Sequence, residues 1–410
     1  MGNIYATLVH GLLFVRFGNR IGMTPFDWGL LNSISSLLLG ADLLSALLAQ
    51  RVGRRKLIWF VSSMVCRSLR FLAVLVALLL NCFGSAHASA VLICGVCLSN
   101  FFAALATPPW LSWLADLVPA RDHGAFWGRR AAWIDFSNLC VLMPACALVD
   151  WVPEAWKTPT LIGVFVVALA IGVVDLIVHS TLPEPDPQLP PRTPMLRQIA
   201  EPLRDRGFRP WLWFNVCWTF SMALGGSLSL VYFDKYLGID KNLLGGAFVL
   251  AALPTIGSML TGARSGARVD RLGPKRVLLW GHFFWSIFPA FWIFATPRTA
   301  LFWLGCAGFI SGTASRAAMV ATNKLITRYP PRDHCAMYVA VSSLVGNLAA
   351  GIGSLAAGSF VHALRGWSFP LFGWTFMGFH ILFVASVVLR LASALLLIPR
   401  LRNPEIPRHA

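Results

Sequence analysis

The chain has 410 residues, of which 57% are hydrophobic and only 12% are charged. Soluble domains usually carry about 25% charged residues, and a single hydrophobic core stops growing near about 250–300 residues. This composition therefore excludes a large water-soluble protein and indicates an integral membrane protein. The formal net charge of +17 raises the question of a nucleic-acid partner, which we do not expect because the basic residues follow a topological pattern.

Apolar runs of about 18–25 residues, the length that an α-helix needs to cross about 30 Å of hydrocarbon, recur along the whole chain. We predict twelve spans, at residues 2–17, 28–50, 57–80, 88–113, 131–150, 159–181, 208–232, 243–264, 277–296, 300–323, 337–362 and 369–398. The first span is short, contains His10 and Arg16 and begins with almost no tail, so a truncated first helix is one interpretation. We expect no cleavable signal peptide, because neither a basic leader nor a small-residue cleavage site is present.

The basic residues are distributed unevenly between alternate loops. If the N-terminus is cytoplasmic, the segments on that side carry 21 lysine and arginine residues, and the loops on the other side carry six. Lysine and arginine are retained on the cytoplasmic side of a membrane. We therefore predict a multi-pass protein of the plasma (inner) membrane with both termini in the cytoplasm.

Two sequence patterns occur once in each half of the chain, at corresponding places. The first pair aligns Gly53 with Gly273, and their basic neighbours also match. The second pair shares Pro-x-Arg-Asp-His: "VPARDHGAFWG" contains Arg121 and follows the fourth span, and "YPPRDHCAMYV" contains Arg332 and follows the tenth. Two repeats in register indicate a duplicated chain.

A proline-rich, charged segment at residues 182–207 separates the two halves. Such a composition cannot build a core and is typical of a semi-rigid linker. We therefore predict an N-terminal six-helix bundle at 1–181, a cytoplasmic linker at 182–207, a C-terminal six-helix bundle at 208–398 and a cytoplasmic tail at 399–410.

Over essentially its whole length the chain resembles the major facilitator superfamily of secondary transporters, whose loop signature is G-x-x-x-D-[RK]-x-G-[RK]-[RK]. The second half carries the better copy, with a proline at one basic position; its matching residues are Gly266, Asp270, Arg271, Gly273 and Lys275. The first half has Ala46 and Gln50 where the signature has glycine and acid; its matching residues are Arg51, Gly53, Arg54 and Arg55. The resemblance implies an all-α fold of twelve transmembrane helices in two pseudo-symmetric bundles, and it identifies no subfamily.

In relatives this signature resembles a latch on the cytoplasmic side. An acid at the end of one helix can lie against the positive N-terminus of another. We expect Asp270 to approach the region between Gly124 and Arg130 in an outward-open state, with a weaker counterpart at Gln50. The alternative is that the signature residues only enforce the topology.

Charged side chains inside a membrane are costly and usually line a cavity or pair with one another. Asp42 lies in the second span, and Arg67 and Arg70 lie in the third. One interpretation is that Asp42 carries a coupled proton and is tuned by Arg70. The other is that an Asp–Arg pair only fixes two helices together.

Arg316 in the tenth span is our candidate for binding an anionic or hydroxylated solute, because the corresponding helix lines the cavity in relatives and guanidinium binds carboxylate. The polar residues Asn32, Asn215 and Asn347 are further candidates for the solute site. We expect Arg390 and Asp135 to be structural residues, because both are near enough to the inner membrane face to extend toward it.

Trp110 and Trp113 are typical of the inner membrane interface, or alternatively of a platform on which a sugar stacks.

We therefore expect a secondary active transporter that moves a small solute by alternating access, coupled to H⁺, as a monomer without a metal or cofactor. The site should lie near the bilayer midplane between the halves. Alternatives are an efflux pump for drugs or metabolites with the same fold, although the fifth span lacks the glycine-proline pattern of drug antiporters, and a sensor or scaffold that transports nothing. We do not expect an enzyme, because we find no nucleotide-binding loop and no metal-spaced cluster.

Overall fold

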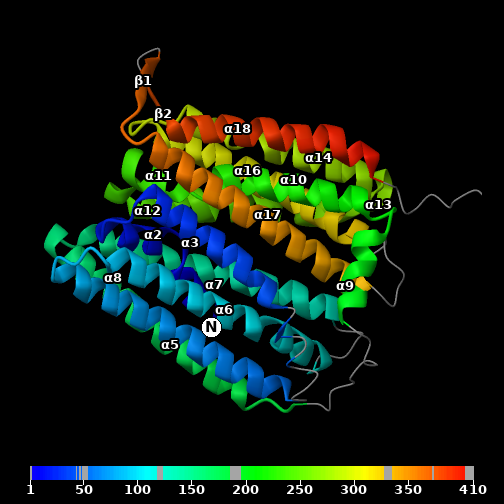
Figure 1. The fold of residues 1–410 in the computed structure, drawn as a ribbon, viewed down its shortest axis with the longest axis horizontal. Helices are drawn as coiled ribbons and strands as arrows, with labels where there is room; N and C mark the ends of the chain where they lie inside the picture. The colour runs from blue at the N-terminus through cyan, green and yellow to red at the C-terminus, as the bar shows by residue number, and fades with distance from the viewer. Residues whose placement is uncertain are drawn as a thin grey trace, which may run out of the picture. The chain divides into compact units, whose positions relative to one another are not determined.

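The computed structural model describes residues 2–42, 44–45, 48, 54–117, 123–184, 195–326, 335–371 and 374–401 (Figure 1). The chain forms two compact units. Unit 1 contains Met1–Pro190 together with Phe233–Lys235 and Ile239–Ala247, and the rest of the chain forms unit 2. Two short segments from the second half of the sequence therefore pack within unit 1.

Unit 1 is built from helices of the first half of the chain and one short helix of the second half. They are α1 (Gly2–Val9), α2 (Gly11–Arg20), α3 (Pro25–Leu38), α5 (Arg55–Cys82), α6 (Ala88–Leu117), α7 (His123–Trp151), α8 (Glu154–Ser180) and α12 (Leu243–Ala247). Short 3₁₀ turns follow α3 at Leu39–Ala41 and precede α12 at Ile239–Lys241.

Unit 2 contains the remaining helices, and α11 (Ser229–Tyr236) contributes residues to both units. Its helices are α9 (Met195–Arg204), α10 (Arg209–Gly226), α13 (Leu253–Leu272), α14 (Pro274–Ile287), α15 (Ala290–Ile293), α16 (Ala300–Ile326), α17 (Cys335–Ala363) and α18 (Gly378–Ala392). A five-residue π-helix, Phe248–Ala252, precedes α13, and another, Ser393–Leu397, follows α18 before a final 3₁₀ turn at Ile398–Arg400.

The two units share one pattern of helix packing. In unit 1 the contacting pairs include α1 with α7, α1 with α8, α3 with α6, α5 with α6 and α5 with α8. In unit 2 the corresponding pairs are α10 with α17, α10 with α18, α13 with α16, α14 with α16 and α14 with α18. The duplication read from the loop motifs thus extends to the packing of the helices.

Eight of the described helical segments are long and apolar enough to cross a membrane. The other four predicted spans coincide with helices that are broken, shorter or less apolar. The first span is divided into α1 and α2, where Gly11 adopts a positive φ of 64° that disfavours other residues. The helix α3 begins at Pro25, with a reciprocal cap in which the Thr24 and Asp27 side chains each accept a backbone N–H.

Two predicted segments have a different structure from the one expected. The predicted twelfth span begins at residue 369, but residues Ser368–Leu371 (β1) and Trp374–Met377 (β2) form an antiparallel hairpin, and helix begins only at Gly378. Figure 1 shows this hairpin extending beyond the end of α18. Within the linker, Met195–Arg204 forms the helix α9, because its apolar residues recur with helical spacing despite the surrounding prolines.

Small residues allow the helices α13 and α16 to approach closely. A Cβ atom added at Gly312 would lie 2.0 Å from the carbonyl oxygen of Pro254, and one at Gly308 would lie 2.4 Å from that of Val249. The π-helix precedes Pro254, which cannot donate a backbone hydrogen bond. The helical segment is therefore distorted next to this proline, as a π-helical turn. On α17, Gly346 and Gly353 similarly face α10, as expected for helix packing.

Candidate functional site

The helices α1, α5 and α8 meet around a buried ion pair. The Nη2 atom of Arg67 on α5 lies 2.8 Å from Oδ2 of Asp175 on α8, and the two side chains are 9% and 7% exposed. Glycines permit this approach, since a Cβ atom at Gly2 would lie 2.8 Å from the same Asp175 oxygen and one at Gly172 would lie 3.1 Å from the Tyr5 ring. The helices thus approach most closely, through small residues, at the place where Arg67 and Asp175 pair.

His179, one turn further along α8, completes this group. Its Nδ1 atom lies 2.8 Å from the backbone carbonyl of Asp175 and 3.4 Å from the carboxylate oxygen Oδ1. The Arg67 guanidinium lies 5.3 Å from the centre of the Tyr5 ring. The Nη1 atom of Arg67 and the Tyr5 hydroxyl are buried and have no hydrogen-bond partner among the described residues. The group therefore contains two donors that its own contacts leave unused.

Arg70, in the next turn of α5, is only 2% exposed and contacts neutral groups. Its guanidinium donates to Oγ of Ser99 at 3.3 Å and to Oδ1 of Asn100, and its Nη1 atom lies 3.0 Å from Nδ1 of His10. Asn100 in turn donates to Oγ of Ser35 at 2.7 Å. No carboxylate in the described part of the chain pairs with Arg70, so neutral dipoles alone offset its charge.

A cavity of about 660 Å³ lies within unit 1 beside the Arg67–Asp175 pair. Sites for small molecules usually have about 300–1,000 Å³. Its aromatic wall contains Tyr5, Trp59, Trp110 and Trp133. Its ionisable lining residues are His10, Arg67, Arg130, Asp175 and His179.

The described residues that line this cavity include both signs of charge. They contribute the guanidinium groups of Arg67 and Arg130 and the carboxylate of Asp175. The Arg130 guanidinium lies 4.8 Å from the centre of the Trp110 ring. The arrangement has the properties needed to hold a small solute with apolar faces and acceptor groups.

The candidate residues of unit 1 do not all come together. Arg67 lines the cavity and Arg70 contacts its wall through His10. Asp42 follows the 3₁₀ turn after α3, and its Oδ1 atom is buried with no hydrogen-bond partner among the described residues. The expected pairing of Asp42 with Arg70 is not present, because Arg70 faces α1 and α6. Asn32 lies on α3 and is half-buried.

The candidate residues of unit 2 make contacts of their own. The Nε atom of Arg316 on α16 donates to Oγ of Ser258 on α13 at 2.7 Å. Asn215 on α10 donates to the backbone carbonyl of Ser342 at 2.7 Å. Asn347 lies half-buried on α17. These contacts are compatible with structural roles as well as with solute binding, so the assignment to a solute site stays a prediction.

The signature loops are described only in part. The predicted residues Arg51, Gly53, Arg121 and Arg332 lie outside the described residues, as does the side chain of Asp270. Gly273 connects α13 to α14 with a positive φ of 80°, and Nζ of Lys275 donates to the carbonyl of Pro399 at 2.6 Å.

The other described signature residues lie at the ends of helices. Arg54 is exposed and occupies the position before α5 without a capping hydrogen bond from its side chain, and the first residue of the helix, Arg55, is buried. Gly266 and the exposed Arg271 belong to α13. The predicted latch stays a prediction.

Two of our interpretations of single residues are wrong. Arg390 does not extend to a membrane face, because it is fully buried, donates to the carbonyl of Met222 at 3.3 Å and lies 5.0 Å from the Phe288 ring. Trp113 is also fully buried, with its indole N–H bonded to the carbonyl of Pro183 at 2.9 Å. Both residues are therefore part of the packed interior.

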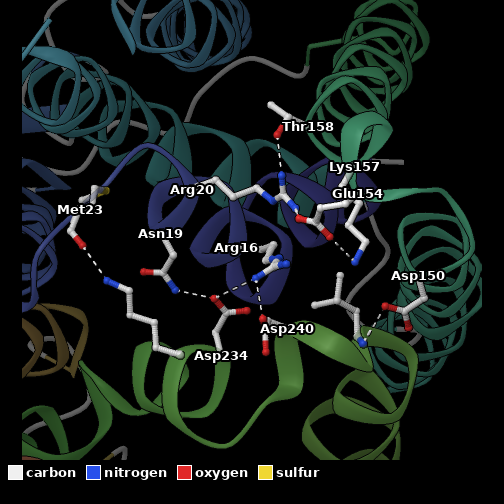
Figure 2. Close-up of polar contacts among 12 residues, drawn as sticks. Arg16, Asn19, Arg20, Met23, Asp150, Glu154, Lys157, Thr158, Asp234 and Asp240 are labelled. Carbon is white, nitrogen blue, oxygen red and sulfur yellow. Dashed lines mark hydrogen bonds and ion pairs between the residues drawn. The ribbon is translucent and has the colours of Figure 1, made fainter. Parts of the chain in front are cut away.

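A second polar cluster, the Arg16 cluster, joins α2 to the segments of the second half that pack in unit 1. It consists of Arg16, Asn19, Asp234 and Asp240. Figure 2 shows Arg16 between two carboxylates, with its Nη1 atom 3.8 Å from Asp234 and 3.4 Å from Asp240. Asn19 donates to Asp234 at 2.6 Å. The only sequence signal for this cluster was an arginine within an apolar span.

Asp150 holds the adjacent helix α12 by its N-terminus. Its two carboxylate oxygens accept the backbone N–H groups of Leu243 and Leu244 at 3.0 and 2.8 Å. The first N–H groups of a helix have no partner within the helix, and a carboxylate there is also favoured by the helix dipole. The residue thus fixes the start of α12 against α7.

Solved structures with similar folds cover nearly the whole chain. The nucleoside transporter NupG is 11% identical with a TM-score of 0.66, covering 97% of this chain and 98% of its own. A bacterial homologue of the human lysosomal transporter Spinster, inward-facing and unoccupied, is 16% identical with a TM-score of 0.68, covering 99% and 96%. A D-xylose–proton symporter is 17% identical with a TM-score of 0.69, covering 98% and 96%.

Among curated proteins, the probable anion transporter 3, chloroplastic, of Arabidopsis thaliana is 32% identical over 116 residues. The match covers 28% of this chain and only 22% of that protein's length. A family model for the major facilitator superfamily matches residues 3–265 and 227–409. Because the two matches of the family model together cover nearly every residue, the chain belongs to the major facilitator superfamily.

Proposed function

We propose that this protein is a secondary active transporter that moves a small solute across a membrane by alternating access and is driven by the proton gradient. Membership of the superfamily and the membrane-spanning helices support transport. The similar proteins are named as transporters of nucleosides, of xylose with protons, and of anions, so they leave the solute open.

The observation that carries the proposal is the charged group in the cavity wall. Asp175, Arg67 and His179 form a chain of ionisable groups beside a space large enough for a solute. A proton and an arginine guanidinium compete for the oxygens of a carboxylate. A carboxylate that is paired with arginine in one state and protonated in another can therefore couple solute binding to protonation. We assign the coupled proton to the Asp175–His179 pair.

Asp42 is the alternative proton carrier. Its buried oxygen without a partner among the described residues is the observation that favours it. It is not among the described residues that line the cavity, however, and none of the described hydrogen bonds or ion pairs connects it to the charged groups there. We therefore rank Asp42 second.

The Arg16 cluster supports a mechanism with two alternating states. Its acidic residues follow the linker in the sequence, whereas Arg16 and Asn19 precede it. Arg16 and Asp234 are 11% and 1% exposed and Asp240 is 29% exposed, so these ion pairs can separate only if water enters to hydrate the buried charges. We propose that the cluster closes one side of the transport path and opens during the cycle.

The location of the protein is proposed from the distribution of its basic residues. The protein is a multi-pass membrane protein, and we propose the plasma (inner) membrane with both termini cytoplasmic, on the distribution of basic residues. We further propose that it acts as a monomer. An efflux pump with the same fold, or a binding protein without transport, would retain the cavity but differ in the direction or presence of flux.

The test is flux in proteoliposomes that contain a pH-sensitive dye. Sugars, nucleosides and organic acids are added in turn, and we expect at least one to acidify the lumen only when the protein is present. Asp175→Asn and His179→Gln should abolish the solute-dependent acidification, whereas Asp42→Asn should retain it. Arg365→Gln, an exposed residue of unit 2, is the control.

If acidification persists in Asp175→Asn and His179→Gln and is lost in Asp42→Asn, the coupled proton is carried by Asp42 instead. If the folded protein moves none of the solutes, the alternative of a sensor without transport is supported instead. Folding of each variant is checked by its thermal unfolding in detergent.

A further inference from the structure

We propose that His380 is a pH-sensitive clamp. In its neutral form it holds the end of the β1–β2 hairpin on the start of α18, and in its protonated form it releases this end. The clamp lies in unit 2 and goes beyond the proposed transport function. It consists of the hydrogen bonds that the two ring nitrogens of one buried histidine form.

The Nδ1 atom of His380 accepts a hydrogen bond from the hairpin. The backbone nitrogen of Met377, the last residue of β2, lies 3.0 Å from it. His380 is the third residue of α18, so this contact also caps the start of the helix. A backbone N–H can only donate. Nδ1 therefore carries no proton while the hairpin is in place.

The Nε2 atom of the same ring bonds to α11. It lies 3.0 Å from the hydroxyl oxygen of Tyr232. A neutral imidazole carries one proton, and because Nδ1 of His380 is an acceptor, this proton is on Nε2, which donates to Tyr232. The neutral form thus uses one nitrogen for α11 and the other for the hairpin.

The hairpin also covers the imidazole ring. His380 is 5% exposed, and Phe376 of β2 stacks on it with ring centres 4.9 Å apart and planes inclined by 26°. A charged group is much more costly to bury than a neutral one. A proton is therefore accepted more readily when the end of the hairpin moves and water reaches the ring.

The charged residues of α11 bond away from this imidazole. Asp234 accepts a hydrogen bond from Asn19, and Lys235 donates to the carbonyl of Met23. Asp234 is the one carboxylate in the described helices and strands that pack against α18. A protonated His380 thus gains no ion pair from these elements that offsets the loss of its contact with the hairpin.

The other neighbouring elements provide no negative charge either. Tyr236 on α11 contacts the Phe379 ring, and His362 lies in the last turn of α17, shortly before Arg365. The strands β1 and β2 and the helix α15 contain no titratable residue. The helix α10 contacts α18 further along, where Ser386 donates to a carbonyl of α10. Within the described part of unit 2, a protonated imidazole is therefore not stabilised in place.

Protonation of His380 places a proton on Nδ1 that is directed at the N–H of Met377. Two donors then face each other, so this hydrogen bond is lost, whereas Nε2 still donates to Tyr232. The proton binds more tightly to the state in which the end of β2 has moved, and acidification therefore favours that state. With both termini cytoplasmic, as proposed, the hairpin meets the external pH.

The test is hydrogen exchange of the purified full-length protein in detergent, resolved to single residues by mass spectrometry. It is measured at about pH 8 and about pH 4.5, on either side of the ordinary titration of histidine. Each exchange rate is divided by the intrinsic rate at that pH, and the amides of α5 are the internal reference. We expect the protection of Met377 to fall about tenfold at the lower pH, as for the loss of one hydrogen bond, and that of α5 to stay constant.

Two variants separate titration from hydrogen bonding. In His380→Gln the side chain can accept the same backbone N–H and donate to Tyr232 but does not titrate, so Met377 should be protected at both pH values. In His380→Phe the ring has no acceptor, so Met377 should be unprotected at both. His87→Gln, at an exposed histidine before α6, is the matched control and should leave the pH dependence unchanged.

Equal protection of Met377 at both pH values in the unmodified protein would overturn the proposal, and so would a pH dependence that persists in His380→Gln. A parallel loss of protection in α5 would also overturn it, because the hairpin would then be released only by general unfolding. The comparison of Met377 with α5 uses the unmodified protein, so it decides the matter even where a variant does not fold.

Discussion

Arg67 and Asp175 lie 2.8 Å apart in the interior of unit 1 and join α5 to α8. Removing one partner leaves the other charge buried, which costs about 3–5 kcal/mol, whereas replacing both by apolar residues costs much less. We therefore expect Asp175→Leu to lower the thermal unfolding temperature strongly and the double variant Arg67→Met with Asp175→Leu to recover most of it. A double variant less stable than either single variant would contradict the pairing.

Asp150 accepts two N–H groups at the start of α12. Asp150→Ala should destabilise this helix start by about 0.5–2 kcal/mol, the usual effect of losing a cap. Hydrogen exchange followed by mass spectrometry should show faster exchange at Leu243 and Leu244. The amides of α16, which Asp150 does not contact, provide the internal control, and equal acceleration there would indicate general loosening instead.

The Arg16 cluster should respond to charge reversal. Arg16→Glu places a third negative charge beside Asp234 and Asp240, and we expect it to separate these segments and reduce solute flux severalfold. Adding Asp234→Arg restores an opposite pair, so flux should recover at least in part. The readout is initial uptake at equal amounts of reconstituted protein. Failure of the second change to rescue the first would exclude a direct role of this ion pair in the cycle.

The contact of α13 with α16 depends on the absence of a side chain at Gly312. Gly312→Ala places a methyl carbon 2.0 Å from the Pro254 carbonyl oxygen unless the helices separate. Overpacking of this kind usually costs about 1–3 kcal/mol, so the unfolding temperature should fall. Gly163→Ala in α8 is the matched control, because no heavy atom lies within 4 Å of the added carbon. Equal effects at the two positions would show that the close approach is absent in the membrane.

Arg316 is the candidate for solute binding in unit 2, and its contact with Ser258 provides a way to separate its roles. Arg316→Ala should reduce uptake if the guanidinium contacts the solute. Ser258→Ala removes only the hydrogen-bond partner and should leave uptake near that of the unmodified protein. A loss of the same size in both variants, together with reduced thermal stability, would assign Arg316 to helix packing.

The sequence was sufficient for the fold, because apolar spans and paired loop motifs are encoded locally. The two-bundle prediction is confirmed by membership of the superfamily and by the matching helix pairs of the two units. The points at which a predicted span departs from a continuous helix were harder to predict. The segment at 369–377 is apolar enough for a helix, but its described residues 369–371 and 374–377 lie in two paired strands, since hydropathy does not distinguish helix from strand in a short segment.

For the candidate site, the cost of burying a charge predicts which residues are involved but not which groups they contact. That cost singled out Arg67 and Arg70, but their partners depend on how the helices are rotated against one another, which a single sequence does not contain. The same argument led to the wrong position for Arg390, because a long side chain near a helix end can turn inward as well as outward.

The packing of Asp234 and Asp240 within unit 1 has a consequence for the biogenesis of the protein. Asn19 leaves the ribosome 215 residues ahead of its acceptor, and Arg16 still earlier. When the first six spans enter the bilayer, the carboxylates that neutralise Arg16 have not been synthesised. A separately expressed N-terminal fragment should therefore insert incompletely, and co-expression of the complementary fragment should rescue it.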